Sequence, residues 1–378
     1  MNWSPVDLED WLARQKSTLD EVRSSVESII SEVRDRKDSA LLDYAEKFDG
    51  IRPACVRMSN ADRDAAYEHV SPDITEALSE AYARISRFHE LQRRDDIWLS
   101  STEPGISLGV KTTPLSRVGI YVPGGRASYS STVLMCAVPA KVAGVEKVLC
   151  CTPPPANPLT VIACDIADVD DIYLTGGAQA IAAMTYGTES IEPVEKIVGP
   201  GNRYVTTAKT ILRNTVEIDF PAGPSEIAII ADESARPDYI AADIIAQSEH
   251  DPLSASLLIT TSAGMAEKVG EWIVKLSEEA DRKEIINESL IRSGYMLVKD
   301  MNEAASASNC IAPEHLAIQV QDSLSLIGKI RNAGSIFVGP YAAVACGDYA
   351  TGTNHVLPTA GNAKFFSVYS SDHIHLCH

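Results

Sequence analysis

Short apolar runs alternate with helical patterns from about residue 105 onward, and this alternation constrains the fold more than any other feature of the chain. Strand–helix alternation predicts parallel sheets covered by helices. The predicted strands are residues 118–123, 147–152, 171–175, 196–198, 226–232, 257–261, 296–299, 315–320 and 335–338. The predicted helices between them are residues 131–145, 178–188, 203–212, 237–250 and 263–279. The chain is therefore predicted to have an α/β fold.

The first hundred or so residues follow a different pattern, in which apolar side chains recur at helical spacing. Val22, Val26 and Val33 fall on one face of a first predicted helix. Asp38 is placed to cap a second helix that ends before Gly50. This part of the chain is predicted to be a helical region.

A chain of 378 residues has room for two or three domains, each with its own core. We predict a helical region at 1–104, an α/β domain at 105–232, a second α/β domain at 233–365 and a short tail at 366–378. The boundary near residue 232 is placed where a polar stretch precedes a new helix.

Acidic residues outnumber basic ones, 52 to 33, which gives a net charge of −19. Such a surface repels nucleic-acid backbones and anionic membranes, so neither is a predicted partner. The N-terminus has no signal-peptide pattern, and no stretch approaches the roughly 20 apolar residues of a membrane span. The eight cysteines show no paired metal-ligand spacing and are predicted to be free thiols in a reducing compartment. The predicted location is the cytoplasm.

Three glycine-bearing turns follow predicted strands directly and lead into predicted helices. They are Tyr121-Val122-Pro123-Gly124-Gly125, Gly176-Gly177-Ala178-Gln179 and Gly199-Pro200-Gly201-Asn202. In parallel sheets such turns let backbone amides approach a phosphate at a helix N-terminus, which favours a nucleotide. None of them is the dinucleotide-binding fingerprint, and tight turns require glycine even without a ligand. Both interpretations stay open on these features alone.

Gln247 and His250 lie three residues apart at the end of a predicted helix, so they share one face of it. Asp348 lies in a glycine-flanked stretch, predicted to be a loop on the strand-end side after the strand at 335–338. An amide oxygen, an imidazole and a carboxylate suit zinc or another divalent transition metal. An exposed helix end also explains the first two residues, and spacing alone does not bring all three together.

Glu314 and His315 stand side by side, just after Pro313 and just before the apolar run Leu316-Ala317-Ile318. Pro313 disfavours helix for the residue before it, so the pair is predicted to lie at a loop-to-strand junction. Glutamate and histidine are common general acids and bases, because modest environmental shifts bring their pKa values near neutrality. An adjacent Glu-His pair is also common on solvated surfaces, so the pair alone does not define a site.

Together these motifs resemble those of the histidinol dehydrogenase family. The resemblance runs from residues 38–50 to about residue 365, and it is densest at 118–125, 176–188, 199–205, 219–226, 247–250, 313–318 and 347–358. It implies two incomplete Rossmann-like domains related to those of aldehyde dehydrogenases, the first binding NAD and the second carrying the zinc and catalytic residues. It further implies an intertwined homodimer that oxidises L-histidinol to L-histidine through L-histidinal, with zinc and two NAD, in histidine biosynthesis.

The resemblance also implies roles for individual residues. Those that match the family's NAD contacts are Tyr121, Gln179 and Asn202. Those that match three of its zinc ligands are Gln247, His250 and Asp348. Those that match substrate contacts are Ser225, Gln247, His250, His315, Asp348 and His355. Glu314 and His315 match the acid–base pair, in which the histidine takes a proton from the alcohol and the glutamate activates water on the aldehyde.

The chain departs from the family pattern at its end. Family members continue into a C-terminal segment that brings a fourth zinc ligand, a histidine, and a substrate-binding glutamate, and residues 366–378 have no counterpart of it. His373, His375 and His378 are candidate substitute ligands, although a mobile chain end is the favoured interpretation. Two other functions stay open: zinc- and NAD-dependent oxidation of another small alcohol, and NAD or partner binding by a catalytically weak homologue.

Overall fold

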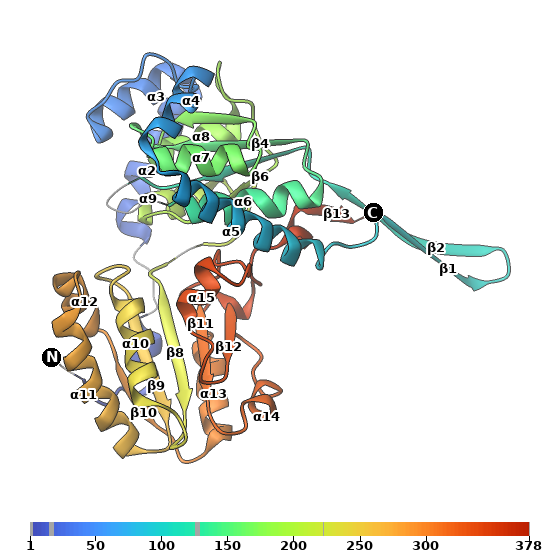
Figure 1. Ribbon diagram of the computed structural model, residues 1–378. Coiled ribbons are helices and arrows are strands. Elements are labelled where there is room, and N and C mark those ends of the chain that lie inside the picture. The colour runs from blue at the N-terminus through green and yellow to red at the C-terminus, as the bar shows by residue number, and fades with distance from the viewer. Residues whose placement is uncertain (1–2, 15–18, 125–128, 222, 378) are drawn as a thin grey trace. The chain divides into compact units, whose positions relative to one another are not determined.

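The computed structural model describes residues 3–14, 19–124, 129–221 and 223–377, which form two compact units (Figure 1). The N-sheet unit comprises Leu19–Asp219, Tyr349–Val356 and Tyr369–His378. The C-sheet unit comprises Met1–Thr18, Phe220–Asp348 and Leu357–Val368. Each unit is therefore assembled from segments that are widely separated in the sequence.

The N-sheet unit contains a five-stranded parallel sheet in the order β5-β4-β3-β6-β7. Its strands are β3 (Arg117–Tyr121), β4 (Lys147–Thr152), β5 (Asp171–Leu174), β6 (Lys196–Val198) and β7 (Glu217–Ile218). Counted along the chain this is the order 3-2-1-4-5, so the direction of winding reverses between β3 and β6. Strands buried on both faces are continuous apolar runs in sequence, which explains why most of these were predictable.

Helices cover both faces of this sheet. The α-helices of the unit are α2 (Arg23–Arg36), α3 (Asp38–Tyr44), α4 (Asn60–Ala66), α5 (Pro72–Glu90), α6 (Ser130–Ala143), α7 (Pro158–Ile166), α8 (Gly177–Tyr186) and α9 (Arg203–Leu212). Shorter helical turns are η1 (Leu19–Val22), η2 (Ala45–Asp49) and η3 (Tyr67–His69). On one face α8 and α9 share a core with Leu149 and Ile197, and α2 packs on both helices. On the other face α6 contacts β3 and β4, with α5 and α7 packed beside it.

The C-sheet unit repeats this plan, with a parallel sheet in the order β10-β9-β8-β11-β12. Its strands are β8 (Glu226–Ala231), β9 (Ala255–Thr260), β10 (Gly294–Leu297), β11 (His315–Gln319) and β12 (Ser335–Val338). Counted along the chain the order is again 3-2-1-4-5, and winding reverses between β8 and β11. The two units are therefore two incomplete Rossmann-like sheets of the same topology.

The helices of the C-sheet unit divide between the two faces of its sheet. They are α1 (Leu8–Arg14), α10 (Pro237–Ser248), α11 (Ala263–Glu279), α12 (Lys283–Leu290), α13 (Met301–Ile311), α14 (Ser323–Ile327), α15 (Val344–Tyr349) and the short turn η4 (Asn362–Lys364). Successive side chains of a strand point to opposite faces. Ile227 and Ile229 accordingly pack with α10, α11 and α12, whereas Ala228 and Ile230 pack with α1 and α13.

The predicted α/β class, with parallel helix-covered sheets and a helical N-terminal region, is confirmed. Strands β4, β6 and β12 begin and end at the predicted residues, and the ends of the other predicted strands differ by at most two residues. Strand β7 was not predicted, because a two-residue strand carries no periodicity.

The two units differ from the predicted domain boundaries. The sequence placed β8 in the domain at 105–232, but β8 is the central strand of the C-sheet. The region at 1–104 also divides, because its first residues lie beside β10. The Val6 N–H donates to the Tyr295 carbonyl at 2.8 Å, and the Tyr295 N–H donates to the Ser4 carbonyl at 3.1 Å. A polar stretch after a strand marks a loop, and it does not reveal which sheet that strand joins.

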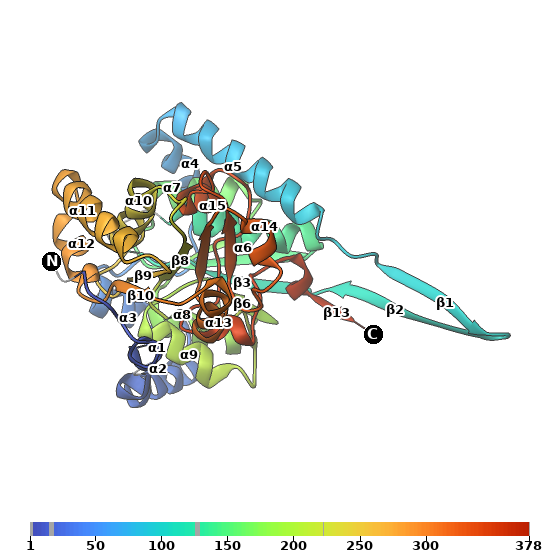
Figure 2. The ribbon, with the colours of Figure 1, turned by 90° about the horizontal axis from the view of Figure 1, so that it is seen from below.

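An antiparallel hairpin, β1 (Ile97–Glu103) and β2 (Ile106–Pro114), was also not predicted. It extends as a narrow two-stranded ribbon (Figure 2), and all of β1 is exposed. A ribbon of two strands buries little apolar surface. It therefore lacks the continuous apolar run by which the sheet strands were recognised.

The interpretation of the chain end as mobile is wrong for its described part. Its elements are η5 (Ser371–Ile374) and β13 (His375–Cys377). Strand β13 pairs antiparallel with β2. His373 Nδ1 lies 3.0 Å from Ser370 Oγ, and His375 Nε2 lies 3.0 Å from a carbonyl oxygen at the end of α6. These two histidines thus make contacts inside the N-sheet unit, and His378 lies outside the described residues.

Candidate active site

Several predicted site residues gather at the amino-terminal edge of the C-sheet. Ser225 and Glu314 immediately precede β8 and β11, and His315 begins β11. Gln247 lies in the last turn of α10, and Asp348 lies in α15. Crossover helices run antiparallel to the strands they connect, so helix C-termini and strand N-termini share one edge of a parallel sheet. This topology brings together residues that are far apart in the sequence.

The structure corrects the predicted setting of Asp348. It lies in the helix α15 and not in a loop, and its carboxylate interacts with His250 and His315 at the amino-terminal edge of the sheet. The flanking glycines suggested a loop, but Gly347 is accommodated inside the helix. Helix α10 ends at Ser248, two residues earlier than predicted, so His250 lies just beyond it and is exposed.

The predicted loop-to-strand junction at the Glu-His pair is confirmed. Helix α13 ends where Ala312 adopts a left-handed conformation, with φ of 52°. The Ser335 N–H then donates to the Glu314 carbonyl at 2.8 Å, which joins the start of β12 to the junction. A Cβ atom added to Gly334 would lie 2.6 Å from that same carbonyl oxygen, so the close approach of the two chains requires glycine.

Glu314 is buried, and hydrogen bonds hold its carboxyl group. Ser225 Oγ donates to Glu314 Oε2 at 2.5 Å, and the Glu226 N–H donates to the same oxygen at 3.0 Å. Gln247 Nε2 in turn donates to Ser225 Oγ at 2.7 Å. Burial raises the pKa of Glu314 to about 7, although the hydrogen bonds from Ser225 and Glu226 act in the opposite direction. This carboxyl group is therefore suited to exchanging a proton near neutral pH.

His315 is buried next to Glu314, and its two ring nitrogens have different surroundings. Nδ1 lies 3.3 Å from the Glu226 carbonyl oxygen and 3.7 Å from Glu314 Oε2. Nε2 is buried, and no described residue forms a hydrogen bond with it. Burial is the main cause that lowers the pKa of His315. A neutral imidazole that donates from Nδ1 leaves Nε2 as a proton acceptor.

The donors at this edge fit a divalent metal in their chemistry. Gln247 directs its amide nitrogen to Ser225, so its amide oxygen is the atom that could bind a metal. His250 and Asp348 add a ring nitrogen and a carboxylate, and their charges interact. Three nitrogen and oxygen ligands with an open position suit catalytic zinc. Over the described ranges, no three His, Cys, Asp or Glu side chains lie close enough together to hold a metal ion. The candidate site therefore requires the Gln247 amide oxygen as one of its three ligands.

The hydrogen bond from Ser225 can be tested by the variant Ser225→Ala. We expect the pKa of Glu314 to rise above its value of about 7, because a hydrogen bond to a charged acceptor contributes about 1.5–3 kcal/mol to the ionised form. The measurement is a carboxyl ¹³C NMR titration, in which Glu314→Gln identifies the signal. Ser248→Ala, which removes a buried hydroxyl without a described partner, is the control. An unchanged pKa in Ser225→Ala would contradict the assigned hydrogen bond.

The three predicted cofactor residues lie at the carboxyl ends of N-sheet strands. Tyr121 ends β3, and its hydroxyl accepts a hydrogen bond from the Gly177 N–H at 3.1 Å. Gln179 lies in the first turn of α8 and is buried. Asn202 caps α9 by accepting two N–H groups of its first turn at 2.9 and 3.2 Å. Gly125, at the end of the first glycine turn, lies outside the described residues.

A buried ion pair that was not predicted holds the turn at Gly199. Lys209 Nζ donates to the Gly199 carbonyl at 2.8 Å and lies 2.5 Å from Asp219 Oδ1, while the Gly199 N–H donates to Asp219 Oδ2 at 2.8 Å. Gly199 has a φ of 115°, and an added Cβ would lie 2.2 Å from the Tyr121 carbonyl oxygen. The turn is therefore clamped on both its donor and its acceptor. The signal in the sequence was a lysine on the apolar face of the predicted helix at 203–212.

His89 and Asn354 were not predicted as site residues either, yet they anchor the segment that carries His355. Asn354 Nδ2 donates to the Met135 carbonyl at 2.7 Å and lies 3.3 Å from His89 Nε2. Burial lowers the pKa of His89 to about 4, so its ring is neutral and available as an acceptor. His355 belongs to the N-sheet unit, whereas Ser225, Gln247, Glu314, His315 and Asp348 belong to the C-sheet unit.

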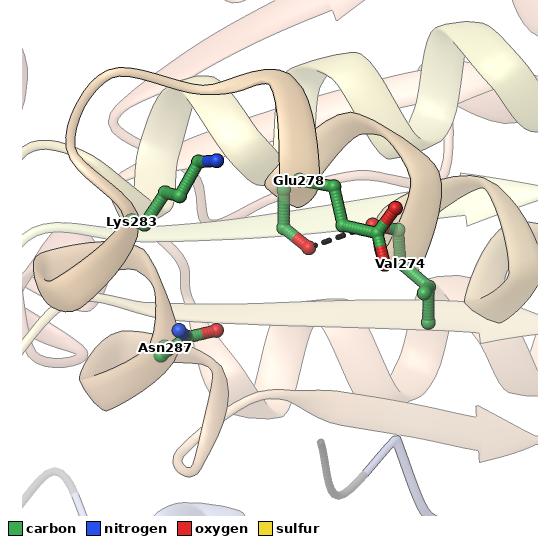
Figure 3. Close-up of a pocket in the computed structure, with 5 residues that line it drawn as sticks. Val274, Glu278, Lys283 and Asn287 are labelled. Atoms are coloured by element: carbon green, nitrogen blue, oxygen red, sulfur yellow. Dashed lines mark hydrogen bonds between the residues drawn. The ribbon is translucent and has the colours of Figure 1, made fainter.

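A separate hollow of about 270 Å³ lies on the C-sheet unit, away from these residues in the sequence (Figure 3). Its lining comes from α11 and α12 and consists of Val274, Ser277, Glu278, Lys283 and Asn287. The Ser277 hydroxyl donates to the Val274 carbonyl at 2.8 Å. The hollow contains none of the predicted site residues, and its polar groups supply no constellation for catalysis.

Comparison with known proteins decides the family. A family model described as histidinol dehydrogenase matches residues 12–374. The histidinol dehydrogenase of Methanosarcina barkeri is 47% identical over 374 residues, which cover 98% of this chain and 86% of that protein. That of Methanothermobacter thermautotrophicus is 46% identical over 370 residues, which cover 97% and 87%. The chain belongs to the histidinol dehydrogenase family.

Solved structures agree with this family and show that its fold is shared with an aldehyde dehydrogenase. The crystal structure of histidinol dehydrogenase from Elizabethkingia anophelis matches with a TM-score of 0.94 at 35% identity, covering all of this chain and 88% of that one. An acetylating aldehyde dehydrogenase from Geobacillus thermoglucosidasius matches with a TM-score of 0.53 at 14% identity, which shows a shared fold alone. The chain is thus an oxidoreductase with the predicted fold. Among its described helices, none is both long and apolar enough to cross a membrane.

Proposed function

We propose that this member of the histidinol dehydrogenase family oxidises L-histidinol to L-histidine through L-histidinal, with zinc and two NAD, in histidine biosynthesis. The observation that carries this proposal is the buried Glu314–His315 pair, held beside Ser225, Gln247 and Asp348 at one edge of the C-sheet. The pair combines a carboxyl group whose pKa is about 7 with a histidine whose pKa is lowered by burial. These are the two proton acceptors that oxidation of an alcohol and then of an aldehyde requires.

The proposal assigns the predicted residues to three groups. The zinc ligands are Gln247, His250 and Asp348, the NAD contacts are Tyr121, Gln179 and Asn202, and further substrate contacts are Ser225 and His355. When bound, zinc supplies a Lewis acid that orients the amine and imidazole of histidinol, and NAD supplies the hydride acceptor. The protein's own residues supply the proton transfers.

His315 acts as the base in the first oxidation. The Glu226 carbonyl, 3.3 Å from Nδ1, accepts the Nδ1–H and so holds the tautomer in which Nε2 carries the lone pair. Nε2 takes the proton of the alcohol as a hydride leaves the carbinol carbon, which yields the aldehyde. Because burial lowers the pKa of His315, the ring starts neutral and can accept this proton.

Glu314 acts in the second oxidation. Its carboxylate takes a proton from a water molecule as the water oxygen bonds to the aldehyde carbon, and the protonated His315 returns its proton to the aldehyde oxygen, which produces the hydrate and a neutral His315. The hydrate loses a second hydride while His315 takes a hydroxyl proton, and the resulting carboxylic acid releases its own proton to give the carboxylate of histidine. Ser225 and the Glu226 N–H hold the carboxyl group of Glu314 throughout.

The first test is the stoichiometry of NADH production by purified protein supplied with zinc, NAD and L-histidinol. We expect two NADH for each histidinol, loss of activity after treatment with a chelator, and recovery on adding zinc. One NADH for each histidinol would indicate an alcohol dehydrogenase that stops at the aldehyde. No turnover by folded, zinc-loaded protein would overturn the proposed substrate, and other small alcohols would then be assayed.

We also propose that the protein is a cytoplasmic homodimer. The family resemblance supports the dimer, and the eight cysteines, seven of them free among the described residues, fit a reducing compartment. Light scattering of the purified protein tests the dimer, because a monomeric mass at micromolar concentration would exclude it.

A further inference from the structure

A buried carboxyl group near the candidate active site has no part in the chemistry proposed above. Asp243 lies on α10 within the apolar core that α10, α11 and α12 form with one face of the C-sheet, and it is 7% exposed. Gln319 Nε2 donates to Asp243 Oδ2 at 3.3 Å. The Val344 N–H donates to Asp243 Oδ1 at 3.4 Å.

The buried position of the Asp243 carboxyl group lowers the stability of the folded protein. Both of its hydrogen-bond partners are neutral, and burial raises the pKa of Asp243 to about 6. Burying a carboxyl group without a cation costs folding free energy, and an apolar side chain of similar size often packs more favourably in such a place. The stability of the C-sheet unit therefore does not explain why an acid occupies this position.

Each of the three elements that Asp243 joins carries part of the candidate active site. Helix α10 presents Gln247 one turn beyond Asp243, on the same face. Strand β11 begins at His315, directly after Glu314, and ends at Gln319. Helix α15 begins at Val344 and carries Asp348. The Asp243 side chain thus links α10 and α15, which carry proposed zinc ligands, to β11, at whose start the proposed bases lie.

Helix α15 depends on this contact in particular. The residue before it is Ala343, whose side chain has no oxygen that could cap the first turn. Asp243 accepts the Val344 N–H, so a residue of α10 caps the start of α15. A helix of six residues is too short to form stably without such tertiary contacts. Asp348 lies near the end of α15, so its position depends on how Asp243 holds the start of this helix.

We propose that Asp243 is a positioning residue that fixes α15 against α10 and β11, and thereby sets where Asp348 stands relative to Gln247 and the Glu314–His315 pair. The inference rests on the proposed function for the identity of the metal and the substrate. Removing the link weakens the binding of zinc and histidinol. It leaves the KM for NAD unchanged, because the proposed NAD contacts belong to the N-sheet unit.

Four variants separate this role from a general loss of stability. Asp243→Leu removes both hydrogen bonds and keeps the branched shape of the side chain, and Asp243→Ala serves if the larger leucine does not fit. Asp243→Asn keeps an acceptor for the Val344 N–H, and its amide can donate to Gln319 Oε1, which has no partner among the described residues. Ile286→Ala is the control, because it opens the same apolar core on α12 without touching the link.

The measurements are zinc affinity by competition with a chromogenic chelator, KM for histidinol and for NAD, thermal melting, and hydrogen exchange over residues 344–349. We expect Asp243→Leu to raise the Kd for zinc by about 10–100-fold, the usual effect of losing a residue that supports a metal ligand. We also expect a higher KM for histidinol and faster exchange over 344–349. Asp243→Asn should stay within about threefold of wild type in zinc affinity. Ile286→Ala should lower the melting temperature alone.

Each other result overturns the role of Asp243. Unchanged exchange over 344–349 in Asp243→Leu would show that Asp243 does not hold α15. If Ile286→Ala weakened zinc binding as much as Asp243→Leu does, loss of stability would explain the weaker binding, and no positioning role would be needed. Failure of Asp243→Asn to retain zinc affinity would show that the charge matters and not the link. A wild-type protein that neither binds zinc nor oxidises histidinol overturns the proposed function instead, and the exchange measurement then decides the role of Asp243 alone.

Discussion

Glu314→Gln is expected to slow the second oxidation by about 10²–10⁴-fold, the usual contribution of a positioned base, while the first hydride transfer proceeds near its wild-type rate. Glutamine keeps the size of the side chain and can still accept hydrogen bonds from Ser225 and the Glu226 N–H. Its amide cannot take a proton from water. The measurement is rapid-quench analysis with L-histidinol, in which the variant accumulates L-histidinal and yields one NADH in its fast phase.

The pH dependence gives an independent check of the same residue. The base form of Glu314 is required, and burial raises its pKa to about 7, so the rate of the second oxidation should increase as the pH rises through about 7. Glu314→Gln should lack this rise. The matched variant His315→Gln should slow the first hydride transfer as well as the second, because His315 accepts a proton in both oxidations. Equal slowing of both steps in Glu314→Gln, or a rise with pH that persists in it, would assign the base to another residue.

Lys209→Met is expected to lower the free energy of unfolding by about 3–5 kcal/mol, the range seen when one partner of a buried ion pair is removed. The side chains of Lys209 and Asp219 are each 2% exposed, so the variant removes the Lys209 cation from beside a buried carboxylate. It also removes the donor to the Gly199 carbonyl, so the turn loses one side of its clamp. The measurement is urea unfolding of the purified protein, with the KM for NAD as a second readout that should increase.

An exposed ion pair provides the control for this prediction. Arg23 and Glu27 pair at 2.9 Å, and their side chains are 53% and 51% exposed. Arg23→Met should change the free energy of unfolding by less than about 0.5 kcal/mol, because solvent screens such pairs. The double variant Lys209→Met/Asp219→Asn should recover part of the stability, since it leaves no uncompensated charge. A loss in Lys209→Met no larger than in Arg23→Met would show that the buried pair is not needed for stability.

Local sequence patterns predicted most of the fold. Strands such as β4 and β6 lie buried on both faces and so are continuous apolar runs, which a single sequence displays directly. The hairpin of β1 and β2 escaped prediction because most of its side chains face solvent and no apolar run marks it. The chain end was expected to be mobile because nothing near it in the sequence predicts a partner. Its three-residue strand is ordered by pairing with β2, which lies more than 250 residues away in the sequence.

By itself the sequence determined the chemistry that is available: an adjacent carboxylate and imidazole at a loop-to-strand junction, metal-type donors at a helix end, and glycine turns after strands. Residue type and local spacing carry this information because pKa range, donor type and backbone freedom belong to individual residues. Only the tertiary structure decided that the Glu314 cluster forms at the amino-terminal edge of the C-sheet. The crossover helix α10 carries Gln247 to that edge, α15 adds Asp348, and burial there raises the pKa of Glu314. Both effects depend on packing between distant segments, which no local pattern encodes.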